Sequence, residues 1–209
     1  TYRGRKVGTF GDASVFSFSP NKTITTGEGG MLVTNNKEIA KNARMLKDYG
    51  QDKRFHYVKL GHNYHLTEIQ AAIGIQQLKK IDTILGKKRT NARILTDKLS
   101  AIDKIIPPQE KSYATHAYSL YSIRIKPFNA VSRDYVKRLL LKSGIQVRVY
   151  FPPVHESPFI KDFKFKKDAL SNTEIVASTI LSLPSSPRLG DKDLTYISSS
   201  IQRIFNARF

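Results

Sequence analysis

The first 50 residues alternate between short apolar runs and polar turns, as in proteins that mix strands and helices. Residues 13–19 predict a strand, and the density of its apolar stretch VFSF is typical of a strand buried in an α/β sheet. Residues 31–34, MLVT, predict a second short strand. The pair Asn35-Asn36 then predicts a turn and the start of a helix, which we expect to end at Gly50 as its C-cap.

The clearest helical pattern follows a polar, aromatic stretch at 51–65 that we interpret as a loop. Residues 66–85 read LTEIQAAIGIQQLKKIDTIL, with Thr67 and Gln70 at the spacing of a capping box. The pattern continues through residues 87–102, so it predicts one long helix or two in tandem. A long helix joining two domains is a natural interpretation, with a boundary near residue 90.

The pattern after Pro107-Pro108 changes to that of an α+β module. Ser132 is expected to cap a helix that ends before Gly144, and Asp191 to cap the last helix. The predicted elements are, in order, a strand at 121–125, the helix after Ser132, a strand at 145–149, a helix near 172–182 and a helix near 191–205.

Composition narrows the class of protein only a little. The 209 residues contain no cysteine, which excludes disulfides and thiolate metal sites and suits a cytoplasmic protein. No apolar run is long enough to span a bilayer. The net charge of +18 leaves nucleic acid open as a partner, but the basic residues are spread along the chain without an RNA-binding motif. A nucleic-acid role is therefore the weakest of the alternatives.

Candidate chemistry gathers in residues 15–30, VFSFSPNKTITTGEGG, where one lysine lies between a strand and a glycine cluster. A Walker phosphate loop requires its glycines before the lysine, and here they come after Lys22, so that interpretation fails. Taken alone, the stretch favours a turn with a surface lysine over a functional site.

Several separated blocks change this interpretation. The segments GDASVFSFSPNKTITTGEGGMLVTNN and LGHNYHLTEIQAAIGIQQLKKID closely resemble the DegT/DnrJ/StrS family of sugar aminotransferases, which are pyridoxal-phosphate (PLP) enzymes of fold type I. The later segments HAYSLYSIRI, GIQVRVYFPPVHESP and SLPSSPRL match in order and spacing, so the resemblance covers essentially the whole chain. Agreement over several blocks is more specific than one short motif.

The resemblance implies roles for particular residues. Lys22 matches the lysine that binds the PLP aldehyde covalently and moves the proton during amino transfer. Ser17 matches a hydroxyl contact to the PLP phosphate. Asn63 matches an asparagine that reaches the phosphate of the neighbouring subunit's cofactor, which implies a homodimer with shared active sites. Without the resemblance, Ser17 is an ordinary strand serine and Asn63 a turn residue.

Histidines give weaker indications. His116 and His155 match positions where the family often has histidines near the sugar-nucleotide pocket, although structural histidines are an equal alternative. His56, His62 and His65 lack a carboxylate or cysteine at ligand spacing, so we expect no metal site.

The resemblance also implies what the chain represents. Family members carry a long segment before TYRGR that holds a phosphate loop, a ring-stacking aromatic and an acid for the pyridine nitrogen. We therefore expect an α/β protein that is the C-terminal part of such an enzyme: a remnant of the large PLP-binding domain at 1–89 and a complete small α+β domain at 90–209. Apolar faces within residues 1–50 are expected to lie uncovered.

Three functions remain open from the sequence. The first is a PLP-dependent aminotransferase that moves an amino group to a nucleotide-linked keto-sugar, with glutamate as the amino donor that the resemblance implies. The presence of Lys22 favours it, because dehydratase relatives carry histidine there. The second is an inactive remnant that retains dimerisation or sugar-nucleotide binding. The third is a basic nucleic-acid-binding protein.

Overall fold

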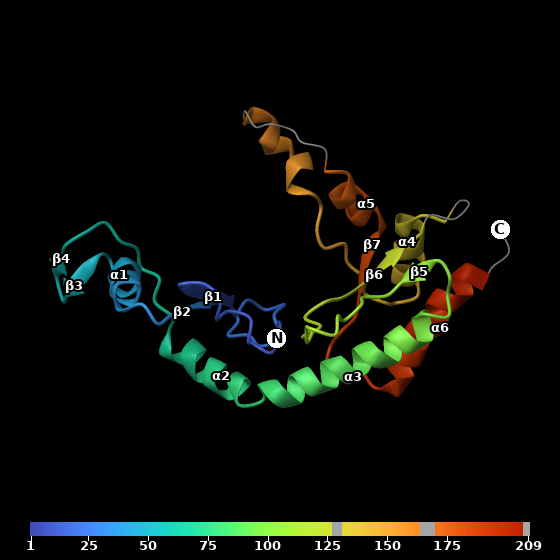
Figure 1. Ribbon diagram of the computed structural model, residues 1–209, viewed down its shortest axis with the longest axis horizontal. Coiled ribbons are helices and arrows are strands. Elements are labelled where there is room, and N and C mark those ends of the chain that lie inside the picture. The colour runs from blue at the N-terminus through green and yellow to red at the C-terminus, as the bar shows by residue number, and fades with distance from the viewer. Residues whose placement is uncertain (127–130, 164–169, 207–209) are drawn as a thin grey trace. The chain divides into compact units, whose positions relative to one another are not determined.

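The chain divides into two compact units. A computed structural model describes residues 1–126, 131–163 and 170–206 (Figure 1). The first unit comprises residues 1–85 with 110–116, and the second comprises 86–109 with 117–209. The assignment of 1–89 and 90–209 to a large and a small domain stays a prediction.

The first unit contains two small antiparallel sheets and two helices. Its elements are β1 (Ala13–Ser17), β2 (Gly30–Thr34), α1 (Lys37–Lys47), β3 (Gln51–Lys53), β4 (His56–Tyr57) and α2 (Glu68–Leu78). β1 pairs with β2 in a register that runs from Ala13 opposite Thr34 to Ser17 opposite Gly30. Both strands predicted within the first 50 residues are therefore present, and the predicted loop at 51–65 contains the short β3–β4 hairpin.

Side chains at the helix starts explain where α1 and α2 begin. Asn36 Oδ1 accepts hydrogen bonds from the amides of Glu38 and Ile39, at 2.9 and 3.1 Å. Thr67 and Gln70 form the predicted capping box. These side chains satisfy backbone donors that have no partner within the helix.

The helical pattern at 66–102 resolves into two helices in tandem. α2 ends at Leu78, and α3 (Ile81–Leu99) begins after Lys79-Lys80. At its C-terminal end, α1 is capped by Asp48 rather than by the predicted Gly50. Gly50 lies two residues further on, where its amide donates to the carbonyl oxygen of Met45 at 2.8 Å.

Apolar residues of the first unit lie largely exposed. Val15 is 79% exposed and Ile69 is 76% exposed, and no residue of α2 is buried. The predicted uncovered faces within residues 1–50 are confirmed. The strand at 13–19 is not buried, because among the described residues β1 pairs with no strand other than β2. Exposed apolar area of this kind marks an interaction surface.

The second unit is a three-stranded antiparallel sheet with helices packed on it. Its strands lie in the order β5 (Ile105–Ile106), β6 (Tyr121–Ile125) and β7 (Ile180–Leu183). Its other elements are the larger part of α3, α4 (Arg133–Lys142), the 3₁₀ turns η1 (Val154–Glu156) and η2 (Pro158–Asp162), α5 (Ser171–Thr179) and α6 (Asp191–Asn206). The alternating side chains of β6 are fully buried, and the apolar faces of α3, α4 and α6 complete one continuous core.

Three predictions for this unit are corrected. The helix expected at 172–182 ends at Thr179, and the residues after it form β7, paired with β6. The strand expected at 145–149 is only an isolated pairing of Arg148 with Ser182, although Ile145 and Val147 are buried as the alternation indicates. α6 begins at Asp191, and the local side-chain bond is made by Asp193, whose Oδ2 accepts from the amide of Gly190 at 2.9 Å.

Two polar side chains of α3 are buried against the segment that precedes α6. Lys88 is 7% exposed, and its Nζ donates to the carbonyl oxygens of Ser185 and Ser119, at 3.0 and 3.3 Å. Asn91 Nδ2 donates to the carbonyl oxygen of Ser186 at 3.2 Å. Burial lowers the pKa of Lys88. These bonds hold the SLPSSPRL segment to the helix.

No helix in the described ranges has the length and apolar character needed to cross a bilayer.

The contrast in burial between the units predicts a contrast in the effect of truncation. Ile123→Ala removes a side chain that is 0% exposed and should lower the free energy of unfolding by about 2–5 kcal/mol in urea titration. Val15→Ala, at 79% exposure, is the matched control and should change it by no more than ~0.5 kcal/mol. Equal losses in the two variants would contradict the core described above.

Candidate functional site

Lys22 lies in the loop that joins β1 to β2, residues 18–29, which we call the lysine loop. The Phe18 amide donates to the carbonyl oxygen of Gly29 at 2.8 Å, which continues the β1–β2 ladder by one step. The Thr26 amide donates to the carbonyl oxygen of Phe18 at 3.0 Å. These bonds close the neck of the loop, and Lys22 lies beyond them with its side chain exposed.

The threonines of the loop satisfy its backbone. Thr25 Oγ1 donates to the carbonyl oxygen of Phe18 at 2.9 Å and accepts from the Gly27 amide at 3.0 Å. Thr26 is buried, and its Oγ1 donates to the carbonyl oxygen of Glu28 at 2.7 Å. A loop whose polar backbone groups are paired internally holds its shape without a regular ladder.

α2 supports the base of the lysine loop. Gln70 Nε2 donates to the carbonyl oxygen of Glu28 at 2.9 Å, so the residue that closes the capping box of α2 also binds the loop. A Cβ on Gly29 would lie 2.5 Å from Thr26 Oγ1 and 2.9 Å from Leu66 Cδ1. A Cβ at position 29 would therefore have to displace one of these side chains, and the positive φ of Gly29, 156°, is one that glycine adopts most readily.

Small polar side chains lie along the start of the loop. Ser17 Oγ lies 3.1 Å from Ser19 Oγ, which in turn donates to Asn21 Oδ1 at 3.1 Å. Ser17, the last residue of β1, is thus linked by hydrogen bonds between polar side chains to Asn21, which precedes Lys22 in the loop. Ser19 was not among the residues singled out from the sequence, and the structure places it beside Ser17.

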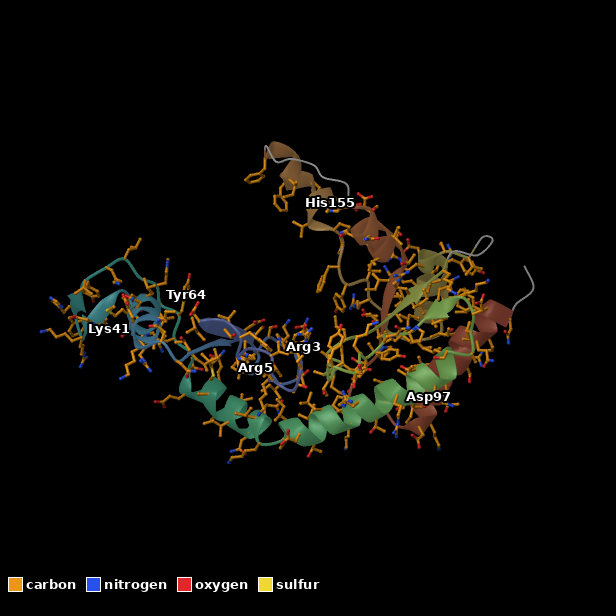
Figure 2. All side chains as sticks on the ribbon, viewed as in Figure 1. Arg3, Arg5, Lys41, Tyr64, Asp97 and His155 are labelled. Carbon is orange, nitrogen blue, oxygen red and sulfur yellow. The ribbon has the colours of Figure 1, made fainter. Side chains whose placement is uncertain are left out.

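Asn63 lies on a different segment of the first unit, between β4 and α2. Its backbone forms an isolated antiparallel bridge with Asp48, and its side chain is exposed. The neighbouring residue Tyr64 is labelled in Figure 2. The expected contact of Asn63 with a partner subunit's cofactor stays a prediction.

His116 and His155 fall in different units. His116 is exposed, and its amide donates to Glu110 Oε2 at 3.0 Å within the first unit. The His155 side chain, in η1 of the second unit, is only 13% exposed (labelled in Figure 2). Its Nε2 lies 3.4 Å from Glu174 Oε1 without hydrogen-bond geometry. Sugar-nucleotide binding by either histidine stays a prediction.

Two of the three remaining histidines, His56 and His65, have carboxylate neighbours that the sequence spacing did not reveal. His56 Nδ1 lies 2.6 Å from Asp52 Oδ1, and His65 Nε2 lies 2.9 Å from Asp48 Oδ1. In the part of the chain that the structure describes, no three histidine, aspartate or glutamate side chains converge as metal ligands do.

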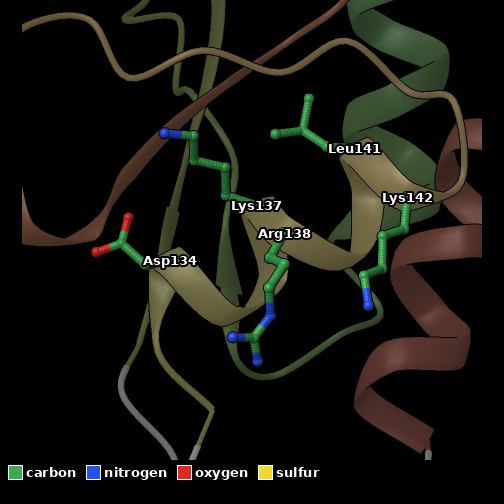
Figure 3. Close-up of a pocket in the computed structure, with 5 residues that line it drawn as sticks. All are labelled: Asp134, Lys137, Arg138, Leu141 and Lys142. Atoms are coloured by element: carbon green, nitrogen blue, oxygen red, sulfur yellow. The ribbon is translucent and has the colours of Figure 1, made fainter.

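A groove in the second unit lies along the basic face of α4. It has a volume of about 490 Å³ and is lined by Asp134, Lys137, Arg138, Leu141 and Lys142 (Figure 3). All five residues come from one helix, and none is among the predicted site residues. This arrangement is that of a solvated helix face.

Comparison with known proteins identifies the class to which this fold belongs. Residues 1–202 match the DegT/DnrJ/EryC1/StrS aminotransferase family. The chain belongs to that family.

Named relatives and a solved structure agree with this assignment. The chain is 36% identical to GDP-perosamine synthase of Vibrio cholerae, over 97% of the chain and 55% of that protein. It is 31% identical to UDP-4-amino-4,6-dideoxy-N-acetyl-beta-L-altrosamine transaminase of Campylobacter jejuni, over 96% of the chain and 54% of that protein. It superposes on Helicobacter pylori PseC, an aminotransferase of pseudoaminic acid biosynthesis, with a TM-score of 0.89 and 30% identity, over 98% of the chain and 56% of PseC. The chain thus spans about half the length of these relatives.

The close approach at Gly29 predicts that a single methyl group loosens the lysine loop. Gly29→Ala should speed tryptic cleavage after Lys22 several-fold, because the added Cβ displaces Thr26 or Leu66. Gly86→Ala is the matched control: a Cβ there meets nothing within 4 Å, and alanine in the middle of α3 should stabilise the helix by about 0.5–1 kcal/mol. Unchanged cleavage in Gly29→Ala would contradict the tight base of the loop.

Proposed function

We propose that this chain forms the lysine-bearing part of a PLP-dependent aminotransferase that acts on a nucleotide-linked keto-sugar, with an amino acid, glutamate, as the amino donor. The single observation that carries the proposal is Lys22, exposed on a closed loop, in a chain of this aminotransferase family. The names of the relatives support a nucleotide sugar as substrate, since two of them carry GDP-linked or UDP-linked amino sugars in their names.

The residues of the lysine loop fit PLP by their chemistry. Lys22 supplies a primary amine, the side-chain group that condenses reversibly with an aldehyde to form a carbon–nitrogen double bond. Ser17 and Ser19 supply hydroxyl donors for phosphate oxygens, five and three residues before it along the chain. Each hydroxyl–phosphate contact is a charge-assisted hydrogen bond and contributes about 1.5–3 kcal/mol.

The chain's own part in the reaction is positioning and proton transfer. When bound, PLP supplies the aldehyde that takes up the amino group and the ring that delocalises the electrons. Lys22 Nζ would hold the bound cofactor. Once released, the same amine would take a proton from the substrate carbon and pass it to the carbon of the cofactor that carried the aldehyde. Neutral lysine is required for both tasks, which favours a site from which water is excluded.

The groups that cover Lys22, shielding it from water, must come from outside the described contacts of the lysine loop. The exposed apolar side chains of β1, β2 and α2 belong to the same unit as Lys22 and form the surface available for such cover. We propose that they pack against the remaining part of a polypeptide of the relatives' length or against a second subunit, in a homodimer with shared sites.

The first test of the function is covalent labelling. In a polypeptide of the relatives' full length that contains these 209 residues, PLP followed by borohydride should attach the cofactor to Lys22, as found by peptide mass mapping. Lys22→Ala should lower transamination by at least about 10³-fold, because the amine serves both as anchor and as proton carrier. Lys37→Ala, an exposed lysine at the start of α1, is the control and should keep full activity. A label on Lys37, or full activity in Lys22→Ala, would show that the assignment is wrong.

The second test concerns sharing of the site between subunits. If Asn63 serves the partner's cofactor, mixed dimers of Lys22→Ala and Asn63→Ala chains contain one site with both groups intact. Activity in the mixture should then exceed that of either parent, with subunit exchange checked by mass-tagged chains. Exchange without recovered activity would count against a shared site.

A further inference from the structure

The segment that carries Asn63 crosses the C-terminal end of α1. The His62 amide donates to the carbonyl oxygen of Leu46 and the Tyr64 amide donates to that of Lys47, both at 2.8 Å. In the opposite direction, the Tyr49 amide donates to the carbonyl oxygen of His62 at 3.0 Å. The last carbonyls of a helix have no partner within it, and here the crossing segment supplies two of the missing donors.

The crossing is close enough to restrict the backbone on both sides. A Cβ on Gly61 would lie 2.0 Å from the backbone nitrogen of Gly50 and 2.6 Å from the carbonyl carbon of Tyr49. Backbone atoms cannot move away as a flexible side chain can. Gly61 therefore lets the segment meet the end of α1 main chain to main chain.

A side-chain pair stands at the end of this crossing. His65 Nε2 lies 2.9 Å from Asp48 Oδ1, and Asp48 is the C-cap residue of α1 whose backbone bridges to Asn63. The hydrogen bond from His65 is the main cause that lowers the pKa of the Asp48 carboxyl, followed by a hydrogen bond from Gln51 and the nearby charge of Lys47. The carboxylate is thus the acceptor in the pair.

Asn63 is held between these contacts. Its neighbours on each side, His62 and Tyr64, are bonded through their amides, and the His65 side chain is bonded to Asp48. His65 is also the last residue before Leu66 and the capping box that starts α2. The pair therefore restrains the segment at the point where it leaves α1 for α2.

We propose that His65 is a positioning residue: its bond to Asp48 holds residues 62–65 on the end of α1 and thereby fixes Asn63 for contact with the cofactor phosphate. The inference rests on the proposed function, which gives Asn63 that contact. His65 itself touches neither cofactor nor substrate in this proposal.

Local hydrogen exchange tests the restraint without any cofactor. An exposed pair of this kind adds little to global stability, so the effect is sought at the amides it restrains. In the 209-residue chain, His65→Ala should speed exchange of the His62 and Tyr64 amides about two- to fivefold. His65→Gln, which keeps a side-chain N–H donor, should restore most of the protection.

The second histidine–aspartate pair provides the matched control. His56 and Asp52 are also exposed and 2.6 Å apart, but they lie in the β3–β4 hairpin. His56→Ala should leave the amides of His62 and Tyr64 unchanged. Unchanged exchange in His65→Ala, or an equal increase in His56→Ala, would overturn the proposal.

PLP affinity then separates this inference from the proposed function. In a polypeptide of the relatives' full length that contains the chain, Asn63→Ala and His65→Ala should each weaken PLP binding. The double variant should be no weaker than Asn63→Ala, because His65 acts through Asn63. Weaker binding in Asn63→Ala with unchanged binding in His65→Ala would overturn the positioning role and leave the proposed function standing. Unchanged binding in Asn63→Ala would instead refute the role of Asn63 in the proposed function, and the positioning role with it.

Discussion

The hydrogen bond from the Phe18 amide to the carbonyl oxygen of Gly29 closes the lysine loop, and the placement of Lys22 depends on it. It extends the β1–β2 ladder to the edge of the loop, so the strands determine where the loop begins and ends. Thr25 and Thr26 then satisfy the backbone inside the neck. The threonine-rich step between lysine and glycines is thus explained by backbone hydrogen bonding.

The same loop is tied to the rest of the first unit through α2. Gln70 closes the capping box at the start of that helix and binds the carbonyl oxygen of Glu28, so one side chain sets both the helix start and the loop base. α2 in turn follows the segment that crosses the end of α1. The positions of Lys22 and of Asn63 are therefore determined by neighbouring parts of one unit.

The two units differ in how they bury apolar surface. In the second unit, β6 and the apolar faces of α3, α4 and α6 share a core from which water is excluded. In the first unit, side chains such as Val15 and Ile69 stay exposed, and few of its residues are buried. A unit organised by backbone hydrogen bonds and caps keeps its local shape, but its apolar faces are free to bind a further chain.

The sequence by itself determined the elements whose signals are local. Asn36, Thr67 and Ser132 mark helix starts because each cap bonds to amides within three residues of it, and the alternation in β6 reflects burial of every second side chain. Lys22 and Ser17 were singled out from one short stretch, and family resemblance supplied their roles. Only the tertiary structure decided that residues 180–183 form a strand, that 145–149 form little more than one bridge, and that His65 pairs with Asp48. Each of these features depends on a partner far along the chain, 17 residues away for His65 and more than 30 for Arg148. A local sequence pattern carries no information about which distant group supplies the hydrogen bond.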